Sequence, residues 1–147
     1  MFKHLLVPTD GSPLAQAAAS RAVAFAREAG ARITFLCVEP PYPTMYLGIG
    51  AITDGRAMRE FKDAGHSVAR GVLEHCEQLA QAAGVACDTL ALLSEAPYEA
   101  IIEAAGRVGA DVIFMASHGH RGVKAMILGS ETQKVLTHST IPVLVYR

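Results

Sequence analysis

The chain lacks an excess of charge of either sign. Its 147 residues include 13 Lys and Arg against 14 Asp and Glu. Nucleic-acid-binding domains carry a strongly basic surface, so this balance gives no support for a nucleic-acid partner. No apolar run approaches the roughly 20 residues that a helix needs to cross a bilayer, and the first residues show no signal-peptide pattern. We expect one soluble, cytoplasmic domain spanning residues 1–147, with no membrane partner.

Cysteine is scarce and unpatterned. Cys37, Cys76 and Cys87 are odd in number, and no two of them form a CxxC pair. Cys37 lies in an apolar run typical of a strand and Cys76 on a helix face, so buried thiols are expected rather than disulfides or metal ligands. Two motifs are missing as well, the G-x4-G-K-[ST] P-loop and the G-x-S-x-G nucleophile elbow, which argues against the enzyme classes that depend on them.

Apolar runs and helical stripes alternate along the chain. Short apolar runs predict five strands, at residues 5–7, 33–38, 87–93, 111–115 and 141–146. Helical spacing predicts four helices, at residues 13–29, 61–83, 97–108 and 130–138. Continuously apolar strands that alternate with helices are typical of a parallel sheet covered on both faces. We therefore predict an α/β, doubly wound, Rossmann-like fold with one five-stranded parallel sheet in the order 3-2-1-4-5.

The first two helices have predicted apolar faces. Ser12 is a candidate N-cap before Pro13, and Gly30 supplies the stop of the first helix. Its inward face is predicted to hold Leu14, Ala18, Ala22, Phe25 and Ala29. The inward face of the second helix is predicted to hold Phe61, Gly65, Val68, Val72, Cys76, Leu79 and Ala83.

Residues 39 to about 56 predict a long mobile loop. They contain Pro40, Pro41, Pro43, Gly48, Gly50 and Gly55. No regular element tolerates that composition, and a loop of this length invites a functional explanation. We expect the part from Pro40 to Arg56 to cover a bound ligand.

Two further loops stand where a ligand should bind. Doubly wound sheets bind ligands beyond the carboxyl ends of their strands, where the winding direction reverses. In the predicted order that point lies between strands one and four, which are followed by residues 8–12 and 116–130. Gly119 and Gly122 permit sharp turns and a close approach of ligand to backbone. Ser130 and Gln133 form a capping-box pattern at a helix start, and such a start attracts anions. Three side chains add donors or positive charge: His120, Arg121 and Lys124.

These loops resemble those of the universal stress protein family, in its ATP-binding branch. The family carries V-P-T-D-G-S after its first strand, here residues 7–12, and G-x2-G-x9-G-[ST] after its fourth. The second motif falls on Ala116, Gly119, Gly129 and Ser130. Ala116 replaces the first motif glycine, a change that costs little if φ is negative there. The I-P-V-L-V stretch at residues 141–145 is similar to the family's last strand.

The resemblance implies an ATP site, with Mg²⁺ or Mn²⁺ held mainly by the phosphates. Asp10 would bond the ribose, Pro8 and Thr9 would line the nucleoside, and the Val38 backbone would pair with adenine. Ribose and phosphate would be wrapped by Ala116, Ser117, His118, Gly119, His120, Arg121 and Gly122. The phosphates would be closed in by Gly129, Ser130, Glu131 and Thr132.

The last strand, from Ile141 to Tyr146, predicts a homodimer. It is apolar and would lie at an edge of the sheet, where unpaired backbone groups invite a second copy. The resemblance implies the same interface.

Simpler interpretations accompany these assignments. Asp10 could cap the first helix or form an Asx-turn with Gly11. His118 and His120 could suggest a metal, but zinc needs three or four N or S ligands and no others cluster here. Residues 117–120 also faintly resemble the H-x-G-H motif of nucleotidylyltransferases, although that motif follows strand one.

The sequence thus predicts an ATP-binding stress-response protein that works as a nucleotide-loaded switch or sensor. No general base stands out, so hydrolysis would be slow or absent. The alternatives are a nucleotide-free interaction module of the same fold and, at lower weight, an adenylyl-transfer enzyme.

Overall fold

The computed structural model describes residues 1–41, 55–120 and 128–147. In chain order its elements are β1 (His4–Pro8), α1 (Pro13–Ala29), β2 (Arg32–Glu39), α2 (Gly55–Ala82), β3 (Cys87–Leu93), α3 (Pro97–Val108), β4 (Val112–Ala116), α4 (Ser130–His138) and β5 (Val143–Tyr146). The strands form one sheet in the order β3-β2-β1-β4-β5, and all pairings are parallel. The predicted fold class and strand order are confirmed.

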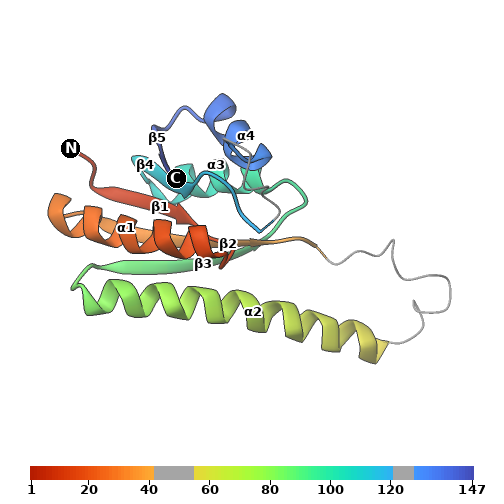
Figure 1. Cartoon of the computed structure of the whole chain (residues 1–147). Coiled ribbons are helices and arrows are strands. Elements are labelled where there is room, and N and C mark those ends of the chain that lie inside the picture. The colour runs from red at the N-terminus through yellow and green to blue at the C-terminus, as the bar shows by residue number, and fades with distance from the viewer. Residues whose placement is uncertain (42–54, 121–127) are drawn as a thin grey trace.

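Helices cover both faces of the sheet. α1 and α2 lie on one face, and α3 and α4 lie on the other (Figure 1). Successive residues of a strand point to opposite faces, so Leu5 and Val7 join the core under α1 and α2, and Leu6 joins the core under α3 and α4. All three are fully buried. The central strands β1 and β4 are buried along nearly their whole length because helices cover both of their faces, whereas β3 at the edge is mostly exposed.

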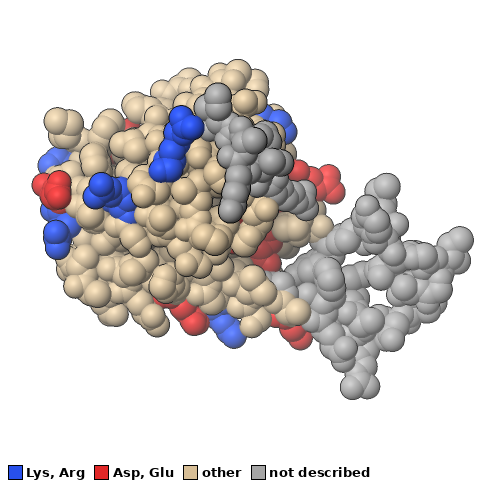
Figure 2. Space-filling model, in the orientation of Figure 1, with Lys and Arg blue, Asp and Glu red and all other residues tan. Residues whose placement is uncertain are grey.

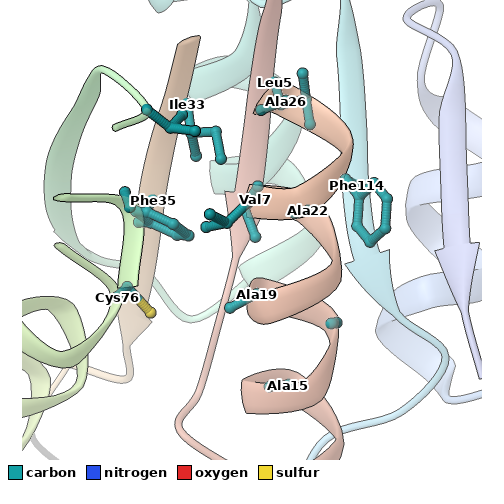
Figure 3. Packing of buried hydrophobic residues seen from close by; sticks show 14 of the residues in the cluster. Leu5, Val7, Ala15, Ala19, Ala22, Ala26, Ile33, Phe35, Cys76 and Phe114 are labelled. Atoms are coloured by element: carbon teal, nitrogen blue, oxygen red, sulfur yellow. The ribbon is translucent and has the colours of Figure 1, made fainter. Parts of the chain in front are cut away.

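α1 packs on the sheet through small residues. Its buried residues are Ala15, Ala18, Ala19, Ala22, Val23 and Ala26, and Figure 3 shows several of them beside Val7 and Phe114. Of the residues predicted to face inward, Ala18 and Ala22 are buried, and Leu14, Phe25 and Ala29 are only partly buried. The predicted face is therefore rotated from the observed one. Alanines occupy the centre because a small side chain lets the helix approach the sheet closely and fill the interface.

α2 also differs from its prediction. It begins at Gly55 rather than near Phe61, and Val68, predicted to face inward, has 68% of its surface exposed. Among the side chains of this helix that the structure describes, the buried ones are Ala69, Leu73, Cys76 and Ala80. The predicted inward residues Phe61 and Gly65 lie outside the described side chains. The sequence contains two overlapping apolar stripes at helical spacing, one through Val68 and one through Ala69. The stripe through Ala69 packs against the sheet, because this small side chain allows a close approach.

The three cysteines are free thiols, as predicted. Cys37 and Cys76 are buried, and burial raises the pKa of each thiol to about 11. Both therefore stay protonated and unreactive at neutral pH. Within residues 1–41, 55–120 and 128–147, no helix has the length and apolar character that a membrane span requires.

Candidate functional site

The loops after β1 and β4 meet at the carboxyl edge of the sheet, as the strand order predicts. Asp10 connects them. Its carboxylate accepts the Ser12 N–H (2.9 Å) within its own loop and the His120 N–H (2.9 Å) from the other loop. The His120 ring nitrogen Nε2 lies 3.0 Å from the Asp10 carbonyl oxygen. Residues 110 positions apart in the chain are thus joined by two hydrogen bonds.

Asp10 is ionised in this setting. Burial raises the pKa of its carboxyl group, but hydrogen bonds from the Ser12 hydroxyl and N–H and from the His120 N–H outweigh burial and hold the pKa below its ordinary value. The bond to Ser12 N–H is the Asx-turn weighed in the sequence analysis. The residue as a whole remains exposed, so its carboxylate can also accept from a ligand.

Two motif glycines are needed for contacts between protein atoms. A Cβ on Gly119 would collide with the Asp10 carboxylate. A Cβ on Gly129 would lie 3.2 Å from both His118 Cα and the Ser117 carbonyl oxygen. Gly119 therefore lets the second loop pack tightly against the first loop at Asp10, and Gly129 lets the two ends of the second loop pack against each other.

The base of the second loop is closed by backbone hydrogen bonds. Ser117 N–H donates to the Tyr146 carbonyl (2.8 Å), and Gly129 N–H donates to the Ser117 carbonyl (2.7 Å). The Thr132 hydroxyl donates to the Ala116 carbonyl (3.1 Å). No non-glycine residue in the described chain has a positive φ, so Ala116 stands in place of the first motif glycine without backbone strain.

α4 begins differently from the prediction. Its N-cap is Gly129, in extended conformation (φ −71°, ψ 157°), and Ser130 is already helical. The predicted capping box of Ser130 and Gln133 is therefore wrong. Gly129 is held against Ser117, and the N-cap lies one residue earlier than predicted. Gln133 N–H instead donates to the Gly129 carbonyl (3.0 Å). Within the described residues no side chain caps this helix, so that part of the protein leaves the N–H groups of its first turn available to a ligand.

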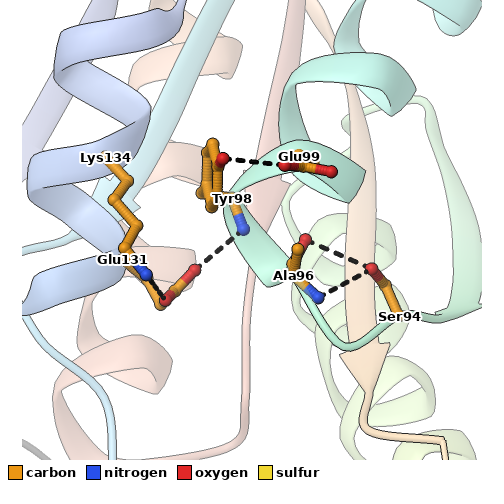
Figure 4. A network of polar contacts seen from close by, with 6 residues as sticks. All are labelled: Ser94, Ala96, Tyr98, Glu99, Glu131 and Lys134. Atoms are coloured by element: carbon orange, nitrogen blue, oxygen red, sulfur yellow. Dashed lines mark hydrogen bonds and ion pairs between the residues drawn. The ribbon is translucent and has the colours of Figure 1, made fainter.

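The neighbouring helix α3 is capped by Glu131. Its carboxylate accepts the Tyr98 N–H (2.9 Å) at the start of α3 and the Lys134 ammonium (3.1 Å), as Figure 4 shows. α1 has a cap of its own, since the Ser12 hydroxyl accepts the Ala15 N–H (3.3 Å). Of α1, α3 and α4, only α4 starts without a side-chain acceptor from the part of the chain that the structure describes.

Val38 brings backbone groups to the same edge. Even-numbered residues of β2 bond to β1, since Arg32 N–H donates to the Lys3 carbonyl and the Leu36 carbonyl accepts the Thr9 N–H (2.8 Å). Val38 continues this series two residues beyond Leu36, whose partner Pro8 is the last residue of β1. Its N–H and C=O therefore point over the end of β1, and no residue in the described part of the chain bonds to them there.

A model of the universal stress protein family matches residues 1–147. The chain belongs to the universal stress protein family. A protein of Thermus aquaticus, "Universal stress protein in QAH/OAS sulfhydrylase 3'region", is 34% identical over 151 residues and is covered completely, as is this chain. The universal stress protein UspA from Lactobacillus plantarum superposes with a TM-score of 0.83 at 26% identity, over 99% of this chain and 97% of that one.

A third similar structure is a universal stress protein in complex with cAMP. It superposes with a TM-score of 0.73 at 25% identity and covers 99% of this chain and 97% of that one. Universal stress proteins of this fold therefore include one that binds a cyclic adenine nucleotide.

Two more of the predicted residues, Thr9 and His118, lie at the same edge of this universal stress protein. Thr9 is buried, and its hydroxyl accepts the Gly11 N–H (3.3 Å). His118 Nδ1 lies 3.2 Å from the Ser117 hydroxyl. Residues 42–54, Arg121, Gly122 and Lys124 lie outside the described residues, so the predicted covering loop and these contacts have no structural account. Across the described chain, no three His, Cys, Asp or Glu residues gather into a metal site.

Sequence reasoning did not predict a role for α2 at the site. A surface hollow of about 290 Å³ lies between the loop after β1 and this helix, with Thr9, Gly11, Gly71 and Val72 among its lining residues. Gly11 has a φ of 76°, and a Cβ there would lie 2.6 Å from a methyl group of Val72. The clearest signal in the sequence was Gly71, a glycine inside a predicted helix.

Proposed function

We propose that this universal stress protein binds an adenine nucleotide, with ATP as its main ligand, and works as a nucleotide-loaded switch or sensor. The observation that carries the proposal is the first turn of α4, whose N–H groups have no side-chain acceptor among the described residues. They lie where the winding of the sheet reverses, and backbone donors at a helix start favour phosphate.

Three sets of groups fit the three parts of the nucleotide. The open N–H groups of α4 suit the phosphates, and the ionised, exposed Asp10 carboxylate suits the ribose hydroxyls. The free N–H and C=O of Val38 match the donor and acceptor of adenine. A bound Mg²⁺ or Mn²⁺ would supply charge neutralisation at the phosphates, with most of its ligands from phosphate and water.

Some site residues already use their side chains in contacts within the protein, which limits how they could contact a nucleotide. The Thr132 hydroxyl and the Glu131 carboxylate already have protein partners, so these two residues would serve the phosphates through backbone N–H groups. The His120 ring is turned to the Asp10 carbonyl. We therefore assign His120 to positioning Asp10 rather than to contacting phosphate with its side chain.

We also propose a homodimer built on β5. This strand lies at the edge of the sheet, and its four residues are only partly buried in the single chain. The three free thiols suit a reducing compartment such as the cytoplasm, where we place the switch.

Calorimetric titration tests the ligand. We expect ATP, in the presence of Mg²⁺, to bind more tightly than ADP, AMP or cAMP, because only ATP carries the full triphosphate. GTP should bind at least tenfold more weakly if the Val38 backbone reads the base, since each hydrogen bond is worth about 1 kcal/mol and a mismatched pair is penalised further.

The alternatives have distinct outcomes in the same experiment. No heat with any nucleotide would support the nucleotide-free interaction module. Release of pyrophosphate in the presence of an acceptor would support adenylyl transfer.

A further inference from the structure

β3 is a free edge of the sheet. In the described chain it pairs only with β2. Ile33 N–H donates to the Ala86 carbonyl (3.0 Å) and Ser94 N–H donates to the Glu39 carbonyl (2.9 Å), so even-numbered residues along this strand bond to β2. The outward N–H and C=O groups therefore belong to the odd-numbered residues, which are Cys87, Thr89, Ala91 and Leu93.

This edge lacks the usual devices that block strand addition. Edge strands are commonly protected by Lys, by Pro, by a bulge or by short length. β3 runs for seven residues, C-D-T-L-A-L-L, with neither Lys nor Pro. Its one charged residue, Asp88, faces Arg32 at 3.9 Å. At its end Leu93 leaves 52% of its surface exposed. By contrast β5, the other edge, has four residues.

A groove of about 360 Å³ runs beside this edge, between β3 and α2. Ala69, Leu73 and Ala91 give it apolar lining. Glu74 and Glu77 of α2 also line it. In Figure 2, acidic and basic side chains lie along the surface over α2.

The groove carries a net negative charge. Glu39 lies 3.8 Å from His66, and Glu74 lies 3.7 Å from Arg70. Glu77 forms no ion pair within the described chain. Three carboxylates thus face one guanidinium and one imidazole, which leaves the rim favourable to cations.

We propose that the β3 edge binds an extended segment of a partner protein as an added strand, with Lys or Arg at alternate positions. An added strand satisfies the outward N–H and C=O groups. Alternate side chains of that strand point to the α2 face, where the carboxylates of the groove lie. A second copy of this chain is disfavoured as the occupant, because its own Glu74 and Glu77 would approach those already there.

A labelled heptapeptide tests this directly. We choose Arg at alternate positions with Val and Thr between them, and as a control the same peptide with Glu in place of Arg. We expect anisotropy to report binding of the Arg peptide only, weakened by salt. Amide exchange should slow at Thr89, Ala91 and Leu93 and stay unchanged at Asp88 and Leu90, which already bond to β2.

Two variants separate the backbone from the charges. Ala91→Pro removes an outward N–H without removing a bond to β2, and we expect it to lower peptide affinity about tenfold, as for one lost hydrogen bond and a blocked edge. Ala91→Val, which keeps the N–H, is its matched control. Glu77→Gln should lower affinity about threefold, as for one exposed ion pair, and reduce the salt dependence.

Three results would overturn the proposal. These are no binding of the Arg peptide to the unaltered protein, equal binding of the Glu peptide, or binding that neither Ala91→Pro nor Glu77→Gln weakens while circular dichroism shows both variants folded. Self-association lost on Ala91→Pro would instead assign the edge to a second copy.

Discussion

The Asp10 carboxylate, the Gly119 backbone and the His120 N–H form one joint between the two loops of the site. Each depends on the others, because the carboxylate that accepts the His120 N–H also fills the space beside Gly119 Cα. A substitution at any of these three residues should therefore displace the Asp10 carboxylate. The contacts that Asp10 makes with a nucleotide would then be weakened indirectly.

Gly119→Ala is the smallest test of this joint. The added methyl group would push away the Asp10 carboxylate, so we expect ATP affinity, measured by calorimetry, to fall about tenfold or more, as for a hydrogen bond to a charged group. Gly106→Ala is the matched control. Gly106 lies in α3 with open space around its Cα, and alanine should stabilise that helix by about 1 kcal/mol. Unchanged ATP affinity in Gly119→Ala would contradict the joint.

His4 predicts a pH dependence of stability. It is buried, and Arg32 lies 3.2 Å from its Nδ1, so Nε2 carries the proton and donates to the Thr34 hydroxyl (2.8 Å). Burial and Arg32 lower the pKa of His4 and outweigh the opposite effects of the Gly109 backbone, Asp111 and Asp88. The unfolded chain therefore takes up a proton at a higher pH than the folded one, and stability falls as the pH drops below about 6.5.

Urea unfolding at pH 7.5 and pH 5.5 checks this prediction. The midpoint should fall in acid for the unaltered protein and fall less for His4→Gln, which cannot take up the proton. An equal fall in both proteins would assign the acid sensitivity to other groups.

The helices show which structural features could be predicted from the sequence and which could not. The caps at Ser12 and Gly30 are confirmed because a cap depends on neighbours in the chain. The start of α4 was wrong, since Gly129 is held by Ser117, twelve positions earlier. The inward face of α2 was wrong at Val68 because two apolar stripes overlap there, and only packing against the sheet selects between them.

The same reasoning applies to the site. Strand order alone brings the two loops together. The apolar runs predicted the strands, and the order 3-2-1-4-5 was the one expected for a doubly wound fold. The hydrogen bonds between Asp10 and His120 were not predictable. They depend on the distance between the two loops, and the sequence does not contain that distance. Glu131 illustrates the limit, since its carboxylate faces α3 and not the site.

Ser130→Pro tests the open first turn of α4. Proline suits the first helical position and is found there in α1 and α3, at Pro13 and Pro97. Gly129 before it is already extended, as a residue before proline prefers. The variant should keep the helix and lose one N–H, so we expect ATP affinity to fall about tenfold while adenosine affinity holds. A fall for both ligands would mean that the loop has moved.

We propose different partners for the two edges of the sheet, a second copy at β5 and a basic peptide segment at β3. Even-numbered residues of β5 bond to β4, as shown by the Pro142 and Tyr146 carbonyls, so the N–H of Val145 points to the free side. Val145→Pro should shift light scattering from dimer to monomer and leave the Arg peptide bound. Ala91→Pro should leave the protein dimeric and weaken binding of the Arg peptide. A dimer that survives Val145→Pro at micromolar concentration would move the interface away from β5.

One hydrogen bond has a wider consequence. Ser117 N–H donates to the Tyr146 carbonyl, so the loop proposed to hold phosphate is fastened to the strand proposed to meet a second copy. If a ligand steadies Ser117, it also steadies Tyr146, and thermodynamic reciprocity then requires association to tighten ligand binding by the same factor. ATP affinity should therefore rise with protein concentration, and dilution should release nucleotide. The fraction of protein with bound ATP would then depend on the concentration of the protein as well as on the concentration of ATP.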